Sequence, residues 1–239
     1  MQIKGSTALV TGANRGIGRD FVVELLARGA TVYATARRPE TIDVPGVKTL
    51  RLDITDQAQV DEVAAIAVDT DLLINNAADT AGGSLVTGDL TAIRSVMDSN
   101  YYGTLAMIRA FAPVLAGNGG GTILNVLSAA AWTAVEGNGA YAAAKSAQWG
   151  LTNGVRLELA GQGTHVAALA PGLVGTATLF EFAERHGIEF PDGAVTDPAD
   201  LVRLALDGLE RDEVEIFDTL GRRAKETLAG PPVNFAFEG

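Results

Sequence analysis

The sequence predicts an α/β fold in which a seven-stranded parallel sheet lies between helices, a three-layer, doubly wound arrangement. Short apolar runs alternate along the chain with segments whose apolar residues recur at helical spacing. The expected strands span residues 7–10, 31–35, 47–52, 71–74, 121–127, 165–170 and 214–217. The expected helices span residues 19–29, 57–67, 90–115, 139–159, 196–209 and 220–228.

Length and composition favour one domain over residues 1–239. A chain of this length can bury a large core, and no linker, low-complexity tract or repeat divides it. The net charge of −11 and the pI of about 4.6 disfavour nucleic acid and anionic membranes as partners, because both would be repelled at long range. An anionic ligand must therefore be held by local positive charge.

The sequence carries no sign of export or of membrane insertion. No signal-peptide block opens it, and no apolar run is long enough to span a bilayer. The absence of cysteine excludes disulfides, thiol catalysis and zinc-thiolate sites. We therefore expect a soluble, cytoplasmic protein.

The turn between the first expected strand and the first expected helix is rich in glycine. Residues 11–18 read Thr-Gly-Ala-Asn-Arg-Gly-Ile-Gly. Glycine lets the backbone turn sharply and approach a ligand, while the free amides and positive dipole end of the new helix attract phosphate. Glycine also marks ordinary turns, but the order of strand, glycines and helix favours a pyrophosphate site.

Arginines follow the second expected strand, where a dinucleotide fold reaches the adenosine ribose. An acidic residue at this point would bind a free 2′-hydroxyl, but Ala36 occupies it and Arg37 and Arg38 come next. An arginine fork pairs well with a 2′-phosphate, and Arg15 can approach from the glycine turn. The pattern predicts NADP over NAD; the alternative is that these arginines are solvated charges at a strand end.

Four polar residues are candidate site residues because of their positions in the expected helices and strands. Asn100 lies in the middle of a long expected helix, although asparagine competes with backbone hydrogen bonds there. Ser128 follows the fifth expected strand, at the end where open parallel sheets bind ligands. Tyr141 and Lys145 are four residues apart in the next helix, which puts them on one face, about 6 Å apart along its axis.

Together these motifs resemble those of the short-chain dehydrogenase/reductase family, classical type. The glycine turn has the family's Thr-Gly-x-x-x-Gly-x-Gly spacing, and residues 75–78 are similar to its Asn-Asn-Ala-Gly element. Tyr141 and Lys145 match its Tyr-x-x-x-Lys pair, and the match covers nearly the whole chain. Ala78 departs from the family's glycine, which a negative φ would tolerate. The resemblance implies a Rossmann-like fold.

The resemblance implies an NADP(H) site whose residues are spread along the chain. It assigns Asp53 and Ile54 to the adenine, although Asp53 equally fits a turn residue. It assigns the Pro171-Gly172 loop to the nicotinamide, although these residues alone fit an ordinary strand-end turn. The implied cofactor-binding residues are Gly12, Asn14, Arg15, Gly16, Ile17, Gly18, Arg37, Arg38, Asp53, Ile54, Asn76, Ala77, Tyr141, Lys145, Pro171, Gly172, Val174 and Thr176.

The resemblance also implies a catalytic group of Asn100, Ser128, Tyr141 and Lys145. Hydride addition to a carbonyl leaves an alkoxide that needs a proton, and we expect Tyr141 to act as general acid in reduction and general base in oxidation. Lys145, together with the oxidised nicotinamide, is expected to lower the tyrosine pKa from about 10 and to bind the nicotinamide ribose. Ser128 hydrogen-bonds the substrate oxygen. Asn100 either holds a water that connects Lys145 to solvent or has a packing role.

These expectations combine into an NADPH-dependent oxidoreductase that reduces an aldehyde or ketone to an alcohol, or catalyses the reverse reaction. The family's substrate lid falls at residues 173–195, where apolar side chains suggest a mainly apolar pocket; a helix that covers the core would look the same. Two other classes stay open: a non-catalytic NADP-binding regulator, and epimerase- or dehalogenase-like chemistry on the same site.

The expected partners are a small-molecule substrate and further copies of the chain. The family pairs its two long helices between subunits, and the apolar tail at residues 230–239 needs cover, so we expect a homodimer or homotetramer. His165 and His186 are isolated in the sequence and are expected to be structural or surface residues. No metal site is expected.

Overall fold

The computed structural model describes residues 1–80, 83–133 and 137–229. Its main sheet has seven strands, all parallel, in the order β3-β2-β1-β4-β5-β6-β9. This confirms the predicted sheet. The strands are β1 Thr7–Thr11, β2 Thr31–Ala36, β3 Lys48–Arg51, β4 Leu72–Asn75, β5 Gly121–Val126, β6 Thr164–Leu169 and β9 Glu215–Ile216.

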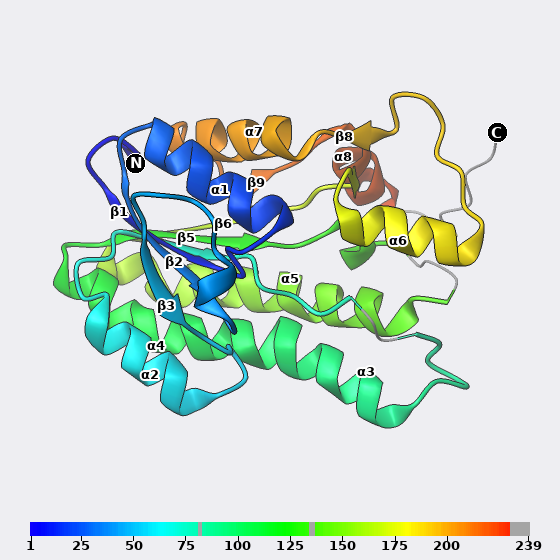
Figure 1. Ribbon diagram of the computed structural model, residues 1–239, viewed down its shortest axis with the longest axis horizontal. Coiled ribbons are helices and arrows are strands. Elements are labelled where there is room, and N and C mark those ends of the chain that lie inside the picture. The colour runs from blue at the N-terminus through cyan, green and yellow to red at the C-terminus, as the bar shows by residue number, and fades with distance from the viewer. Residues whose placement is uncertain (81–82, 134–136, 230–239) are drawn as a thin grey trace.

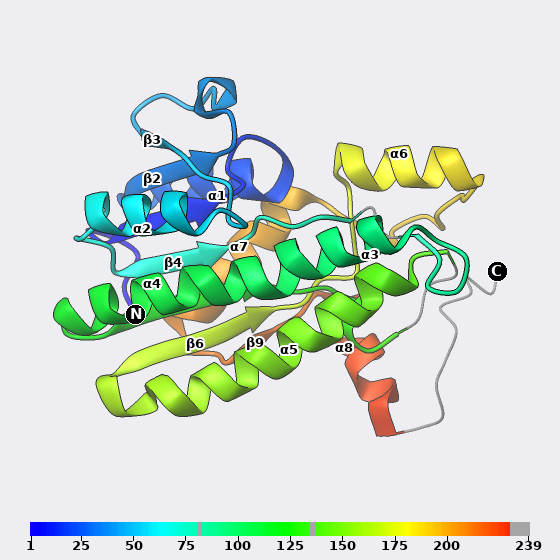
Figure 2. The ribbon, with the colours of Figure 1, turned by 90° about the horizontal axis from the view of Figure 1, so that it is seen from below.

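Helices cover both faces of this sheet (Figure 1). One layer contains α1 (Gly16–Ala27) and α7 (Pro198–Glu210), which pack against each other. The opposite layer contains α2 (Gln57–Ile66), α4 (Thr104–Gly117) and α5 (Gly139–Leu159), which lie side by side in Figure 2. Chain order reverses between β1 and β4, which is where open α/β sheets form ligand crevices.

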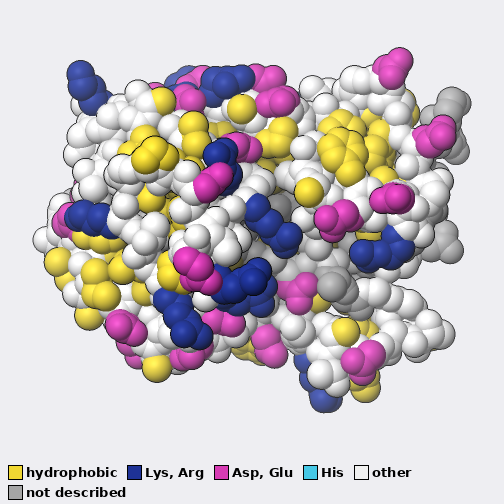
Figure 3. Space-filling view, in the orientation of Figure 1, with side chains coloured by type: hydrophobic (Ala, Val, Ile, Leu, Met, Phe, Trp, Pro, Cys, Tyr) yellow, Lys and Arg dark blue, Asp and Glu magenta, His cyan; other side chains and the backbone are white. Residues whose placement is uncertain are grey.

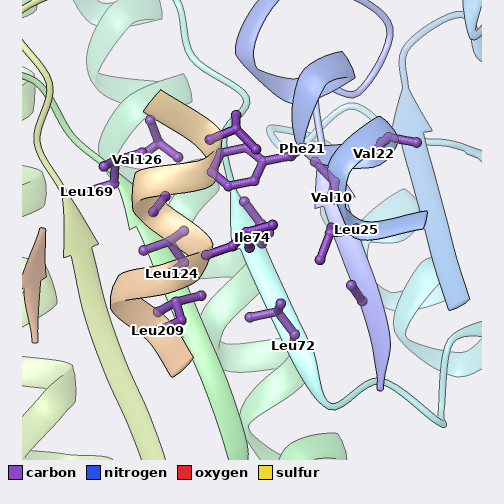
Figure 4. Packing of buried hydrophobic residues seen from close by; sticks show 14 of the residues in the cluster. Val10, Phe21, Val22, Leu25, Leu72, Ile74, Leu124, Val126, Leu169 and Leu209 are labelled. Atoms are coloured by element: carbon purple, nitrogen blue, oxygen red, sulfur yellow. The ribbon is translucent and has the colours of Figure 1, made fainter. Parts of the chain in front are cut away.

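Both faces of the central strands are buried. Figure 4 shows Phe21 and Leu25 of α1 with Leu72 and Ile74 of β4 in one apolar cluster, to which α7 contributes Leu209. A second cluster on the other face joins the sheet to α2, α4 and α5. Strands buried on both faces read as continuous apolar runs, which is why the sequence revealed them.

The helix predicted over 90–115 is interrupted. The structure has α3 (Leu90–Met97), a π-helical turn η2 (Asp98–Gly103) and then α4. Asn100 is the reason: its side-chain amide donates to the Val96 carbonyl at 2.9 Å and so competes with the helical ladder. Such turns often mark functional sites.

The region after β6 contains elements that the sequence did not predict. Two short strands, β7 (Leu173–Val174) and β8 (Val195–Thr196), form a small parallel sheet of their own. Between them lies α6 (Ala177–His186), within the stretch predicted as a substrate lid, and the last helix is α8 (Thr219–Glu226). Short 3-10 turns are η1 Pro39–Thr41, η3 Ala129–Ala131, η4 Ala160–Gln162 and η5 Thr227–Ala229.

Two further expectations concern the C-terminal tail and membrane-spanning helices. The apolar tail at residues 230–239, for which we expected cover at an interface, lies outside the described residues. Within the described part, no helix has the length and apolar character needed to cross a membrane.

Candidate active site

A cavity of about 1440 Å³ runs along the carboxyl ends of the central strands. Its lining includes every residue that the resemblance assigned to the cofactor, together with Ser128. Asn100 does not line it. The polypeptide therefore brings residues separated by more than half of the chain onto one surface.

The glycine turn packs as the predicted phosphate loop requires. Gly12 and Gly16 have positive φ angles of +66° and +53°. A Cβ atom at Gly18 would stand 2.2 Å from the carbonyl oxygen of Gly12, so no side chain fits there. The Asn76 amide donates to the carbonyls of Thr11 at 2.9 Å and Gly12 at 3.2 Å and holds the turn from β4.

The Ala78 departure from the family pattern is tolerated. Among the described residues, Asp212 is the non-glycine residue with a positive φ, so Ala78 keeps a negative one. The first residue of the same element, Asn75, donates to Asn125 at 2.9 Å and ties β4 to β5.

The first turn of α1 has backbone amides available for an anion. Its N-cap, Arg15, makes no capping side-chain hydrogen bond. By contrast, α2, α3, α7 and α8 are capped by Asp56, Asp89, Asp197 and Asp218. Free amides at a glycine-rich helix start fit the pyrophosphate of a dinucleotide.

One end of the cavity, which we call the arginine end, is defined by Arg15, Arg37 and Arg38. All three side chains are exposed, and none of them forms an ion pair within the described part of the chain. Figure 3 shows basic side chains gathered near the segment that follows β2. Unpaired guanidinium groups on an otherwise acidic protein fit a phosphate.

The two interpretations of Asp53 are both compatible with its position. Its carboxylate accepts hydrogen bonds from the Thr55 amide at 3.0 Å and the Thr55 hydroxyl at 2.7 Å, as a turn residue does. The residue also lines the cavity next to Ile54.

The other end of the cavity is defined by Ser128, Tyr141 and Lys145; we call it the catalytic end because the family resemblance assigns catalysis to these residues. Ser128 follows β5, and its hydroxyl accepts a hydrogen bond from the Ala130 amide at 3.2 Å. It is also hydrogen-bonded to the Tyr141 hydroxyl. Lys145, one turn further along α5, has its Nζ 5.6 Å from the centre of the Tyr141 ring. A hydroxyl pair and an ammonium group therefore converge on one wall.

Burial controls the protonation of this end. It lowers the pKa of Lys145 to about 7 and raises the pKa of Tyr141 to about 12, an effect that the Ser128 hydrogen bond partly offsets. We expected Lys145, together with the oxidised nicotinamide, to lower the tyrosine pKa. Among the groups of the chain itself, desolvation of the phenolate outweighs the neighbouring residues and raises that pKa.

Lys145 is held by carbonyl groups. It is only 1% exposed, and its Nζ donates to the Val126 carbonyl and to the Gln148 side-chain oxygen, both at 2.8 Å. Gln148 was not identified from the sequence. Its position three residues after Lys145, on the same face of a helix, is the signal that could have revealed it.

Asn100 acts on the fold around the site rather than on the cavity surface. Its side-chain amide also donates to the Asp79 carbonyl at 2.7 Å, which joins the π turn to the segment after β4. Its backbone carbonyl accepts from the Thr104 hydroxyl at 2.9 Å. These contacts are compatible with a packing role, and the water relay stays a prediction.

Asp218 is a second residue that the sequence analysis missed. It is 8% exposed, and its carboxylate accepts from the Gly172 amide at 2.9 Å, the Gly221 amide at 2.7 Å and the Thr196 hydroxyl at 3.1 Å. It therefore ties the Pro171-Gly172 loop to β8 and α8. Its place directly after the last strand is the available signal.

Four further residues named in the sequence analysis are Val174, Thr176, His165 and His186. Val174 is in β7, and the Thr176 hydroxyl caps α6 by accepting from the Leu179 amide at 3.3 Å.

His165 forms a hydrogen bond with the Glu213 carbonyl at 3.1 Å, as a structural residue would, whereas the side chain of His186 is outside the described part. The described residues contain no group of His, Cys, Asp or Glu that could hold a metal ion.

Comparisons with known proteins agree with this geometry. The short chain dehydrogenase family model matches residues 6–186. A sorbitol dehydrogenase of Cereibacter sphaeroides is 36% identical over 185 residues, 73% of this chain and 72% of that protein.

Solved structures resemble the whole chain. A short chain dehydrogenase from Burkholderia cenocepacia in complex with NADP has a TM-score of 0.87 and 36% identity, covering 96% of this chain and 95% of its own. A family member from Burkholderia phymatum in complex with NAD has the same fold, with a TM-score of 0.83, 22% identity and coverage of 99% of both chains. The chain therefore belongs to the short-chain dehydrogenase/reductase family, classical type, and is an oxidoreductase of that family.

Proposed function

We propose that the protein is an NADPH-dependent oxidoreductase that interconverts an aldehyde or ketone and the corresponding alcohol. The observation that carries this proposal is the convergence of Ser128, Tyr141 and Lys145 on one wall of the cavity. Two adjacent hydroxyl groups can hydrogen-bond one carbonyl oxygen, and a nearby ammonium group can stabilise a phenolate.

The steps follow from these residues. The substrate oxygen accepts hydrogen bonds from the Ser128 and Tyr141 hydroxyls, which holds the carbonyl group at this wall of the cavity. When bound, the nicotinamide of NADPH supplies the hydride that this carbon gains. Tyr141 transfers its proton from Oη to the oxygen, and Lys145 stabilises the phenolate that remains. In oxidation, Tyr141 takes the proton back.

Burial sets the protonation of the free site from which a reduction would start. With its pKa raised to about 12, Tyr141 keeps its proton at neutral pH and is ready to donate it. Lys145, with a pKa lowered to about 7, is only partly charged there.

The preference for NADP(H) rests on the arginine end. A 2′-phosphate can form charge-assisted hydrogen bonds with the three unpaired arginines. Ala36 stands where an acidic residue would bind a free 2′-hydroxyl, so the site lacks the group that favours NAD. The relative from Burkholderia cenocepacia, solved in complex with NADP, supports this choice.

The substrate is a carbonyl compound with an apolar part. Leu179 and Phe182 of α6 and Leu220 of α8 line the cavity, beside polar residues such as Thr133 and Asn138. Apolar side chains next to a few polar groups are typical of small-molecule sites.

We also propose a homodimer or homotetramer. The support is the family's pairing of its two long helices between subunits: Leu90, Tyr102 and Leu157 are exposed in the segments α3, η2 and α5, and pairing would remove their apolar area from water. Light scattering of the purified protein tests this, and a monomeric mass would contradict it.

The experiment for the proposed function is NADPH consumption over a panel of aldehydes, ketones, imines and 3-oxoacyl thioesters, with Tyr141→Phe run in parallel. Consumption that depends on the tyrosine supports the reductase. Tight NADPH binding without consumption favours the regulator. Product formation without a net change in NADPH favours epimerase- or dehalogenase-like chemistry.

A further inference from the structure

A chain of buried side chains connects Lys145 to the π turn. The side-chain oxygen of Gln148 accepts from Lys145 Nζ at 2.8 Å, and its nitrogen donates to the Thr104 hydroxyl at 3.0 Å. Thr104 in turn donates to the Asn100 carbonyl at 2.9 Å. Gln148 is 1% exposed and Thr104 is also 1% exposed, so neither amide nor hydroxyl has access to bulk water.

The direction of these hydrogen bonds fixes the orientation of the Gln148 amide. Thr104 has one hydroxyl proton, and the Asn100 carbonyl takes it. The hydroxyl can then only accept from Gln148, so the amide nitrogen must point towards Thr104 and the amide oxygen towards Lys145. A second acceptor, the Val126 carbonyl, lies at 2.8 Å from the same ammonium.

Resting on the proposed function, in which Lys145 must carry a positive charge, we propose that Gln148 is a positioning residue for Lys145. Its carbonyl dipole stabilises the ammonium form and, together with the Val126 carbonyl, fixes two N–H groups of the lysine inside the protein. The third N–H is left to face the cavity, where the nicotinamide ribose would bind.

The described residues around Lys145 include no charged partner that stabilises its ammonium form. Desolvation is the cause of its lowered pKa, and no ion pair compensates it within the described chain. β5 and η3 contain no titratable residue. The titratable residues that face the same cavity from α5, α3 and the π turn are Tyr141, Arg94, Asp98 and Tyr102. The two neutral dipoles at hydrogen-bond distance, the Val126 carbonyl and the Gln148 side-chain carbonyl, are therefore the main local stabilisers of the charge, and Gln148 supplies the one that a substitution can remove.

The test measures the lysine directly and does not need turnover. The lysines of the chain are Lys4, Lys48, Lys145 and Lys225, so lysine labelled with ¹³C at Cε gives a simple NMR spectrum, in which the resonance lost in Lys145→Arg belongs to Lys145. Its pH titration is compared in the wild type, Gln148→Leu and Gln148→Glu. We expect the midpoint to fall by about one pH unit in Gln148→Leu and to rise by at least as much in Gln148→Glu.

A matched control comes from the same helix. Thr152 is also buried; its hydroxyl accepts from Asn125 at 2.9 Å and donates to the main-chain carbonyl of Gln148 at 2.7 Å, but within the described chain it makes no hydrogen bond to Lys145 or to the Gln148 side chain. Thr152→Val should lower the melting temperature while leaving the lysine midpoint in place. Thr104→Val frees the Gln148 amide to invert, so we expect a midpoint shift smaller than that of Gln148→Leu and in the same direction.

The outcomes separate a positioning role from a packing role. If Gln148 only fills the core, both of its variants lose stability and the midpoint stays within about 0.2 pH units of wild type, which overturns the inference. With a substrate in hand, the alkaline limb of turnover should follow the lysine midpoint in each variant. If the wild type consumes no NADPH with any carbonyl, the proposed function fails, while the titration still decides the role of Gln148.

Discussion

The two ends of the cavity are built in opposite ways. At the catalytic end, Lys145 is 1% exposed and is tied by hydrogen bonds to β5 and, through Gln148, to the π turn. At the arginine end, the side chains are exposed and have no ion-pair partner within the described residues. In the proposed function, the protonation states of Tyr141 and Lys145 are therefore set by the folded core, whereas the preference for NADP(H) depends on exposed arginines that form no ion pair in the described fold.

The largest effect should come from the buried lysine. Its pKa is about 7 in the folded protein against 10.5 as the reference value, so between these pH values the unfolded chain binds more protons. The free energy of unfolding then rises with pH in this window, by up to about 1.4 kcal/mol per pH unit from this group. Below pH 7 the penalty is complete and constant.

Lys145→Met removes that slope. The variant should gain most stability relative to wild type at pH 7 and least near pH 10, as measured by urea unfolding at three pH values. Lys4→Met, at an exposed lysine, is the control and should leave the slope unchanged. A Lys145→Met difference that is constant with pH would contradict the buried-ammonium interpretation.

Arg37→Asp tests the arginine end. The dissociation constant for NADPH should rise about tenfold to hundredfold, because a charge-assisted hydrogen bond is replaced by repulsion, while that for NADH changes little or falls. The control is Arg51→Asp, which makes the same charge change at the end of the adjacent strand β3 but does not line the cavity. Equal affinities of the wild type for both cofactors would rule out the preference.

Asp218→Asn should have an intermediate effect. It removes one charged acceptor from a carboxylate that Gly172, Gly221 and Thr196 share, at a cost of about 1–3 kcal/mol in stability. We also expect weaker NADPH binding, because the Pro171-Gly172 loop loosens. Asp197→Asn, at the cap of α7, is the control: asparagine caps equally well, so NADPH affinity should not change.

The smallest effect is expected at α6. Phe182 lines the cavity and Phe180, two residues away, is 53% exposed and does not. Phe182→Ala should raise KM for apolar carbonyl substrates by about threefold to tenfold, from lost apolar contact area. Phe180→Ala should leave KM unchanged; equal effects of the two substitutions would contradict the assignment of α6 as a substrate wall.

The sequence predicted what is local or periodic. The buried strands, the glycine turn and the spacing of Tyr141 and Lys145 could be predicted because each depends on neighbours within a few residues. In the structure the strands form one sheet, and the glycine turn, Tyr141 and Lys145 line one cavity. Asn100 was noticed because asparagine conflicts with a helix interior, although its consequence, a π turn that divides the helix, was not foreseen.

What the sequence did not reveal depends on distant partners. The bond from Gln148 to Thr104 spans 44 residues, and that from Gly172 to Asp218 spans 46. Neither glutamine nor aspartate is unusual at its position until the fold supplies the partner. The two-residue strands β7 and β8 are likewise too short to produce a periodic signal.

The most direct test of the account compares Tyr141→Phe with Arg37→Asp, measuring for each the NADPH dissociation constant and the rate of a single turnover at saturating NADPH. The account predicts that Tyr141→Phe still binds NADPH but lowers the rate by about a hundredfold to ten-thousandfold, because the variant loses the proton donor and keeps the other residues that line the cofactor cavity. It predicts that Arg37→Asp weakens NADPH binding while the saturated rate stays near that of wild type. A Tyr141→Phe rate within about threefold of wild type would contradict the central claim that the buried end of the cavity performs the proton transfer.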